Sequence, residues 1–301
     1  MTTPIIVMAA GQPTVELGTT STFAVLAGSK ITNTGTTIIN GSAGGNVDGN
    51  VGGDVGLFPG TSFTGHSAKI SGAVHLADAV AIKAKDDLVT AYNDTASRTP
   101  VTTIPSKLGG RTLTPGTYDS VDGTFKITGK LTLDAKGDQN GVFVFKTGST
   151  LVTASASDVN LINGARFCRT FWQVGSSATL GTNSHFVGHI FAMQSITATT
   201  GATIQGQLLA RNGAVTLDNN TITNGYCATT SDGSIDTAGG STDRSGGPTD
   251  TAVAPTAKAV TQTVTGGELP KTSTPLYAVL LMGSILTIVG ALGWRKRKSY
   301  E

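Results

Sequence analysis

The stretch "HFVGHIFAMQSITATTGATIQGQLLARNGAVTLDNNTIT", His185 to Thr223, returns to the same kinds of side chain every 18 residues. One apolar series is Phe186, Ile204 and Ile222, and glycines recur at Gly188 and Gly206. Further series extend upstream, and they comprise Trp172, Ile190 and Leu208, and also Val174, Ala192 and Ala210. The segment from Phe143 to Thr150 matches once more if about eleven additional residues are placed around "DVNLINGARF". A repeat of this length indicates a solenoid.

Eighteen residues suit one coil of a three-sided β-helix, with a short strand and a corner on each side. Side chains alternate in and out along a strand, and stacked coils bury a continuous core that no single coil could bury. We therefore expect apolar residues to point inward: Leu180, Ala198, Ile204, Leu217 and Ile222. Threonines should then point outward: Thr179, Thr197, Thr199 and Thr216 on one side, and Thr203, Thr221 and Thr223 on the next. A β-sandwich would also alternate, but it would not give 18-residue returns.

The overall composition agrees with a large, mainly all-β domain. The chain has 301 residues with 49 Thr and 40 Gly, only 13% charged residues and a net charge of +2. Threonine suits strands and glycine suits tight turns. One segment differs, since His75–Ala96 has an apolar stripe at helical spacing that includes Leu76, Val80, Ala84 and Leu88. We expect a long helix there, with Asp78, Lys85, Asp86 and Asn93 on its solvent face.

The two ends of the chain suggest an exported, anchored protein. Residues 1–12 resemble a truncated signal remnant, 13–227 form the folded domain, and 228–268 lack aromatic residues, as expected of a disordered stalk. "LPKTS" (269–273), an uncharged span (276–294) and a basic tail (295–301) follow. This arrangement resembles the sortase sorting signal of Gram-positive surface proteins, although Ser273 stands where glycine is usual. The resemblance implies a transmembrane precursor, cleavage after Thr272 and linkage to peptidoglycan, with residues Leu269, Pro270, Lys271, Thr272 and Ser273 recognised by sortase.

The chain has two cysteines, Cys168 and Cys227. An extracellular location favours a disulfide between them, and closing a loop of about 60 residues would contribute roughly 4 kcal/mol in the chain-entropy model. Two unrelated thiols are the alternative.

Several motifs in order resemble the ice-binding-like family once catalogued as DUF3494. They include "VELGTTSTFAVLAGSKITNTGTT" (15–37), "GVFVFKTGSTL" (141–151), "FWQVGSSATLGTNSHFVGHIFA" (171–192) and "GAVTLDNNTI" (213–222). The resemblance covers nearly all of the folded domain. It implies a discontinuous three-sided β-helix flanked by one long helix, with the N- and C-terminal segments joined in one solenoid. It also implies ice binding through a flat, uncharged face, for which the candidates are Thr150, Thr179, Thr197, Thr199, Thr203, Thr216, Thr221 and Thr223.

The main alternative is a wall-anchored adhesin or structural module that binds glycan or other cells through an aromatic or charged cleft.

We expect no enzyme, because acidic residues are sparse over 172–227, although Asp119, Asp122, Asp134 and Asp138 lie elsewhere. The four histidines (His66, His75, His185 and His189) form no metal-ligand pattern, so we expect ordinary surface or corner residues and neither metal nor cofactor. The glycine-rich segment 44–56 lacks the period of calcium repeats. No basic surface for nucleic acid is implied.

Overall fold

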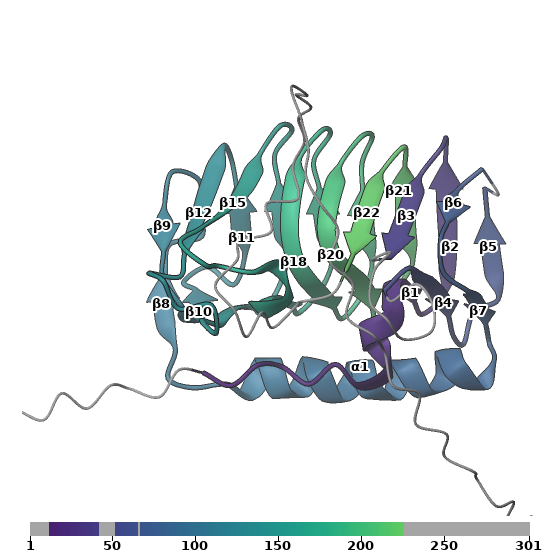
Figure 1. The fold of residues 1–301 in the computed structure, drawn as a ribbon, viewed down its shortest axis with the longest axis horizontal. Coiled ribbons are helices and arrows are strands. Elements are labelled where there is room, and N and C mark those ends of the chain that lie inside the picture. The colour runs from purple at the N-terminus through teal and green to yellow at the C-terminus, as the bar shows by residue number, and fades with distance from the viewer. Residues whose placement is uncertain (1–11, 42–51, 66, 226–301) are drawn as a thin grey trace, which may run out of the picture. The chain divides into compact units, whose positions relative to one another are not determined.

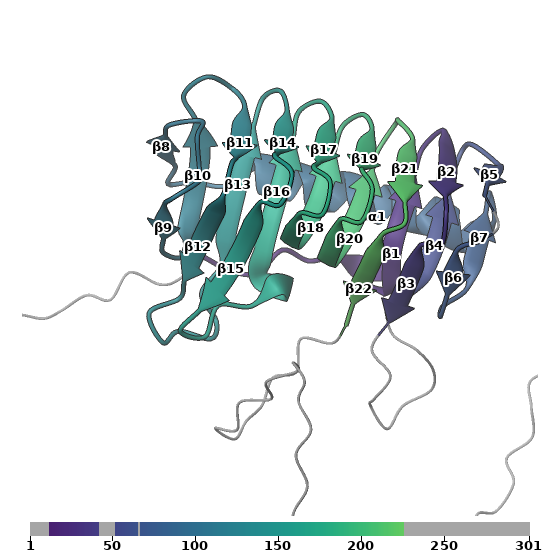
Figure 2. The same cartoon turned by 90° about the horizontal axis from the view of Figure 1, so that it is seen from above.

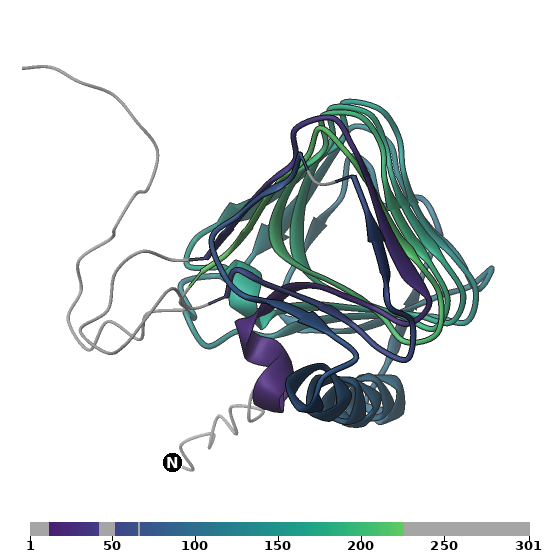
Figure 3. The ribbon, with the colours of Figure 1, turned by 90° about the vertical axis from the view of Figure 1, so that its right-hand side faces the viewer.

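The computed structural model describes residues 12–41, 52–65 and 67–225, which form a three-sided β-helix flanked by one helix (Figure 1). The end-on view in Figure 3 shows the triangular cross-section and the helix lying along one side. All strand pairs within the three faces are parallel, with neighbouring coils in register. The solenoid expected from the 18-residue repeat is therefore present.

The three faces are named here in the order in which each coil passes through them. Face 1 contains β8 (Thr102–Ile104), β10 (Gly116–Ser120), β13 (Phe143–Thr147), β16 (Thr170–Val174), β1 (Phe23–Ala27), β4 (Asp54–Leu57) and β7 (Val74–Leu76). Face 2 contains β11 (Phe125–Ile127), β14 (Leu151–Thr153), β17 (Ala178–Leu180), β19 (Ile196–Ala198), β21 (Val215–Asp218), β2 (Lys30–Thr34) and β5 (Ser62–Thr64). Face 3 contains β9 (Thr112–Leu113), β12 (Lys130–Asp134), β15 (Asp158–Ile162), β22 (Thr221–Asn224), β3 (Ile38–Gly41) and β6 (Lys69–Ile70).

Two long strands, β18 (His185–Ala192) and β20 (Thr203–Ala210), bend from face 3 into face 1. The bend falls at Gly188 and Gly206, which pair with each other and have φ of 111° and 141°. A Cβ at Gly206 would collide with the carbonyl oxygen of Gly188 in the next coil, so glycine alone fits this crossing.

The chain builds this solenoid from two directions. The N-terminal coils, β1 to β7, lie at one end, and helix α1 (Ala79–Ser97) then runs along face 1 to the other end (Figure 1). From β8 the chain winds back until β22 pairs with β3, and β20 and β21 pair with β1 and β2. The joining of N- and C-terminal segments in one solenoid is thus confirmed.

The strand register confirms most of the repeat. Trp172 pairs with Ile190 and Ile190 with Leu208, as the spacing predicts. The copy of the repeat that starts at Phe143 is shifted by two residues, because Trp172 pairs with Phe145 rather than with Phe143. The additional residues expected around "DVNLINGARF" do not include its first half, since Asp158–Ile162 is the regular strand β15, paired with β12. The additional length lies after this strand and includes the short 3₁₀ helix η2 (Phe167–Arg169).

The core fills the interior of the prism with apolar side chains from all three faces. The inward residues expected from the repeat (Leu180, Ala198, Ile204, Leu217 and Ile222) are all buried. The largest side chains form an aromatic column in which Phe145 stacks on Trp172 with 4.0 Å between ring centroids and also lies against Tyr118. Buried aromatic rings of this kind dominate core energetics, so the column stiffens the middle of the solenoid.

Helix α1 begins later than the sequence predicts. His75 and Leu76 belong to β7, and the Asp78 carboxylate caps the helix by accepting a hydrogen bond from the Ala81 amide at 2.8 Å. The buried side is also rotated, because Val80 is 45% exposed. Lys85, expected in solvent, is buried and donates to the carbonyl oxygens of Ala210 (2.6 Å) and Arg211. The reason is that α1 packs over the end of β20, where the chain turns out of face 1, and the Lys85 ammonium group binds two backbone carbonyl oxygens at this turn.

The second core lies between α1 and the outer side of face 1. Ala84 and Leu88 of the helix pack there against Phe171, Phe191 and Leu209. This packing buries face 1, and within the described residues no helix covers face 2 or face 3 (Figure 3).

Several sequence predictions lie outside the described residues: all but Gln12 of the signal remnant, the stalk, the LPKTS motif, the 276–294 span, the basic tail, Cys227 and His66. Within the ranges that the structure describes, no helix has the length and apolarity needed to cross a membrane. The proposed disulfide of Cys168 with Cys227 and the sorting signal therefore remain predictions.

Candidate functional site

Face 2 carries a straight ladder of threonines on its outer side. Thr179 pairs with Thr197, Thr197 with Thr216, Thr216 with Thr32, and Thr32 with Thr64. Each residue is the outward position of its strand, between inward neighbours such as Ile196 and Ala198. Because adjacent strands lie about 4.8 Å apart, the five side chains repeat at that interval over about 19 Å. Figure 2 shows the strands β17, β19, β21, β2 and β5 side by side in this order.

The ladder hydroxyls are free to contact water. Across the described ranges, none of the five hydroxyls hydrogen-bonds to another protein group. Their methyl groups and Cβ atoms are held by β-branched rotamers on paired strands, which restricts χ1. The ladder therefore presents a rigid row of alternating apolar and hydrogen-bonding groups.

The structure separates the eight threonines predicted from sequence. Thr179, Thr197 and Thr216 belong to the ladder. Thr199 lies at the corner after β19, where its hydroxyl donates to the Leu180 carbonyl oxygen at 2.8 Å and lies 3.3 Å from the Thr182 hydroxyl. Its hydroxyl is therefore already engaged.

The remaining predicted threonines lie elsewhere. Thr150 precedes β14, and the ladder position in that strand is Val152, which pairs with Thr179. This displacement follows from the shifted register of Phe143. Thr203, Thr221 and Thr223 do point outward, as predicted, but from face 3.

Sequence reasoning missed two ladder residues, Thr32 and Thr64. Both lie in the N-terminal coils, which are separated from the repeat by the helix, so the 18-residue spacing does not reach them. The segment "KITNT" (30–34) carries little local signal, because one of its two inward residues, Asn33, is polar.

Face 3 is less uniform than face 2. His185 Nδ1 lies 2.9 Å from Asp158 Oδ1, and Lys130 Nζ lies 3.6 Å from Asp158 Oδ2, in adjacent strands. The charges of Lys130 and Asp158 hold water strongly, so this part of face 3 is unsuited to a neutral, ordered contact.

His189 does not lie at the surface, contrary to the sequence prediction. It is 2% exposed, its ring stacks on Phe171 with centroids 5.3 Å apart, and it faces Gln207 in the next strand. Burial lowers the pKa of His189 to about 4. It is a neutral core residue at neutral pH. Among the described residues, no group of three or more His, Cys, Asp or Glu side chains could hold a metal ion.

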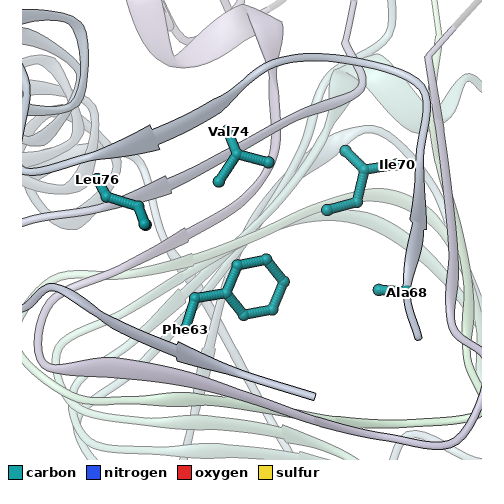
Figure 4. Close-up of a pocket in the computed structure, with 5 residues that line it drawn as sticks. All are labelled: Phe63, Ala68, Ile70, Val74 and Leu76. Carbon is teal, nitrogen blue, oxygen red and sulfur yellow. The ribbon is translucent and has the colours of Figure 1, made fainter. Parts of the chain in front are cut away.

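A hollow of about 250 Å³ lies at the end of the prism formed by the N-terminal coils, on the inner side of β5 rather than on the outer side that carries the ladder (Figure 4). Its lining is apolar: Phe63, Ala68, Ile70, Val74 and Leu76. Phe63 and Ile70 continue the inward positions of Ile31 and Ile39, so the hollow is the open end of the core. Among the described residues that line it, none is charged and Phe63 is the one aromatic side chain.

Comparison with known proteins gives a consistent result. A family model described as ice-binding-like matches residues 25–223. The chain belongs to this ice-binding-like family. It is similar to an ice-binding protein of Nostoc sp. (strain HG1), with 46% identity over 211 residues that cover 69% of this chain and 73% of the relative.

Solved structures of this family share the fold. A crystal structure of an ice-binding protein from an Antarctic biological consortium superposes with a TM-score of 0.66 and 43% identity, covering 73% of this chain and 96% of that one. A second, from Antarctomyces psychrotrophicus, gives 0.63 and 41%, covering 70% and 98%. The resemblance of residues 15–222 to the ice-binding-like family is confirmed.

Proposed function

We propose that this protein binds ice, and that face 2 makes the contact. The observation that carries this proposal is the ladder Thr179, Thr197, Thr216, Thr32 and Thr64, held in register on parallel strands. Family membership and relatives named for ice binding support it.

The physical mechanism is a lattice match between a rigid surface and ordered water. The threonine methyl groups are weakly hydrated, and the hydroxyls form hydrogen bonds with water. Because both groups repeat at the spacing of the strands, the surface favours an ice-like layer of water. Each contact is weak and reversible. The strands are already ordered by the solenoid, so binding costs little conformational entropy, and five contacts can act together. The mechanism needs no catalytic group, metal or cofactor, and we propose a non-enzymatic role.

Thermal hysteresis and inhibition of ice recrystallisation test this proposal. We expect the wild-type protein to show both, and Thr216→Tyr to lose most of each, because a phenol ring would lift the face off the ice. Thr223→Tyr is the matched control, since it places the same ring on face 3. Absence of any effect from the wild-type protein at high micromolar concentration would refute ice binding and favour an adhesin.

We further propose that the protein is displayed on a Gram-positive cell wall, from the LPKTS motif, apolar span and basic tail. The described domain suits this arrangement. β22 ends at Asn224, whose side-chain amide donates to the carbonyl oxygens of Ser21 (3.0 Å) and Phe23 (3.1 Å) beside face 1. The described domain therefore ends at the edge between faces 3 and 1, which is the edge that does not border face 2. A tether attached there would leave face 2 accessible.

Expression in a sortase-competent Gram-positive host tests the anchoring. We expect the protein in the muramidase-released wall fraction, with a mature C-terminus at Thr272 covalently joined to a wall peptide. Thr272→Ala should shift it to the membrane fraction and the medium. Recovery of an uncleaved chain from wild-type cells would contradict the proposal.

We also propose the disulfide between Cys168 and Cys227, because both cysteines belong to a domain expected outside the cell, where thiols are oxidised. Mass spectrometry of a non-reduced tryptic digest should show the two peptides joined. Free thiols on both residues would refute the bond.

A further inference from the structure

The ladder on face 2 changes character towards the β8 end of the prism. Val152 follows Thr179 in register, and Lys126 follows Val152. Lys107 forms a parallel bridge with Lys126, so it continues the same row by one more position. The outward row therefore consists of five threonines, one valine and two lysines.

The chemistry of these last three positions differs from that of the threonines. Val152 has the shape of threonine but lacks the hydroxyl. The lysine ammonium groups are strongly hydrated point charges. Both lysines are exposed, and neither has an ion pair within the residues that the structure describes. Each ammonium therefore keeps its own water shell, which an ice-like layer would have to displace.

At the opposite end the row stays uniform to the last strand. Thr32 and Thr64 belong to the N-terminal coils, and Thr64 lies in β5, at the edge of the seven-stranded sheet. Two charged side chains flank this part: exposed Lys30, two residues before Thr32 and beside Ser62, and half-buried Asp218, two residues after Thr216 and paired with Thr34. Both lie next to the ladder rather than in it.

On the basis of the proposed function, we infer that ice contact is confined to the part of face 2 from β17 to β5. Thr32 and Thr64 are then ice-contacting residues, whereas Val152 and Lys126 lie outside the contact. The site is assembled from segments on either side of helix α1, and it is complete only when the N-terminal coils have stacked on β21. Lys126 and Lys107 limit its length.

A tyrosine scan along the row tests this inference. We expect Thr64→Tyr and Thr32→Tyr to lose most of the thermal hysteresis activity, and Val152→Tyr and Lys126→Tyr to retain most of it. All four positions are outward on face 2, so the substitution is matched. Far-UV circular dichroism and the thermal unfolding midpoint confirm that each variant is folded.

The outcomes separate this inference from the proposed function. If the wild-type protein has no hysteresis, the proposed function fails. If the wild-type protein is active and Val152→Tyr costs as much activity as Thr64→Tyr, ice binding stands and the confined contact is refuted. Full activity of Thr64→Tyr and Thr32→Tyr would also refute it.

A gain of function provides a second test. The double variant Val152→Thr, Lys126→Thr extends the row of threonines from five to seven positions. We expect higher hysteresis than wild type at equal concentration, because the limiting residues have been replaced. Unchanged or lower activity in a folded double variant would contradict the assignment of these residues as the limit.

Discussion

Acid should destabilise this protein through one buried histidine. His189 is 2% exposed, and burial lowers its pKa to about 4, compared with 6.5 for the exposed imidazole of the unfolded chain. Above pH 6.5 the ring is neutral in both the folded and the unfolded chain, so it does not lower the free energy of unfolding. Between pH 6.5 and 4 the unfolded chain binds a proton that the folded chain does not, so the free energy of unfolding falls as pH falls.

The size of this effect follows from the two pKa values. The loss is about 2 kcal/mol at pH 5, and it approaches about 3 kcal/mol once the pH reaches the folded pKa. Such a loss is a large fraction of the stability of a typical domain. Urea denaturation at pH 7, 6 and 5 measures it as a shift in midpoint.

The variant His189→Gln removes the titrating group and keeps a polar side chain beside Gln207. Its free energy of unfolding should lose this acid-dependent component. His185→Gln is the matched control, because His185 lies in the same strand with a 48% exposed side chain, and this variant should retain the component. Equal pH dependence in wild type and His189→Gln would refute the reasoning.

Three further predictions concern stability. Burial lowers the pKa of Lys85 to about 7. Above pH 7 the unfolded chain therefore binds more protons than the folded chain, and the free energy of unfolding increases with pH. Urea titrations from pH 7 to 9.5 should show this increase in the wild-type protein relative to Lys85→Met. Gly201 has φ of 72° and lies under the Asn183 side chain, so Gly201→Ala should cost at least about 1–2 kcal/mol in urea titrations, whereas Gly148→Ala, with open space around it, should cost much less. Phe145→Ala removes the centre of the aromatic column and should cost about 3–5 kcal/mol, measured by calorimetry; a cost below 1 kcal/mol would contradict the packing.

The repeat could be predicted from sequence because parallel coils place chemically similar residues on top of one another. Phe186, Ile204 and Ile222 share one inward column for this reason. The outward direction of Thr179, Thr197 and Thr216 followed from strand alternation. The 18-residue spacing fails where an insertion changes the coil length, as it does after β15. There it placed the register two residues too early. It therefore assigned Thr150 to the position of the face 2 row that Val152 occupies.

The remaining errors have a tertiary origin. Thr32 and Thr64 join the ladder only because the N-terminal coils stack on β21, a contact between residues nearly two hundred positions apart. Lys85 is buried where α1 contacts the solenoid, and His189 is buried where η2 contacts β18. Neither contact can be recognised from the neighbouring residues in the sequence. Their polar character predicted that both side chains would be exposed to solvent, but the tertiary contacts bury them.

The central claim is that face 2, and not face 3, meets the ice. Incorporation into a slowly growing ice hemisphere measures this directly, by the fraction of protein recovered from the ice rather than from the liquid. We expect Thr197→Tyr to be excluded into the liquid and Thr221→Tyr to enter the ice as well as wild type does. Exclusion of Thr221→Tyr together with normal incorporation of Thr197→Tyr would contradict the account.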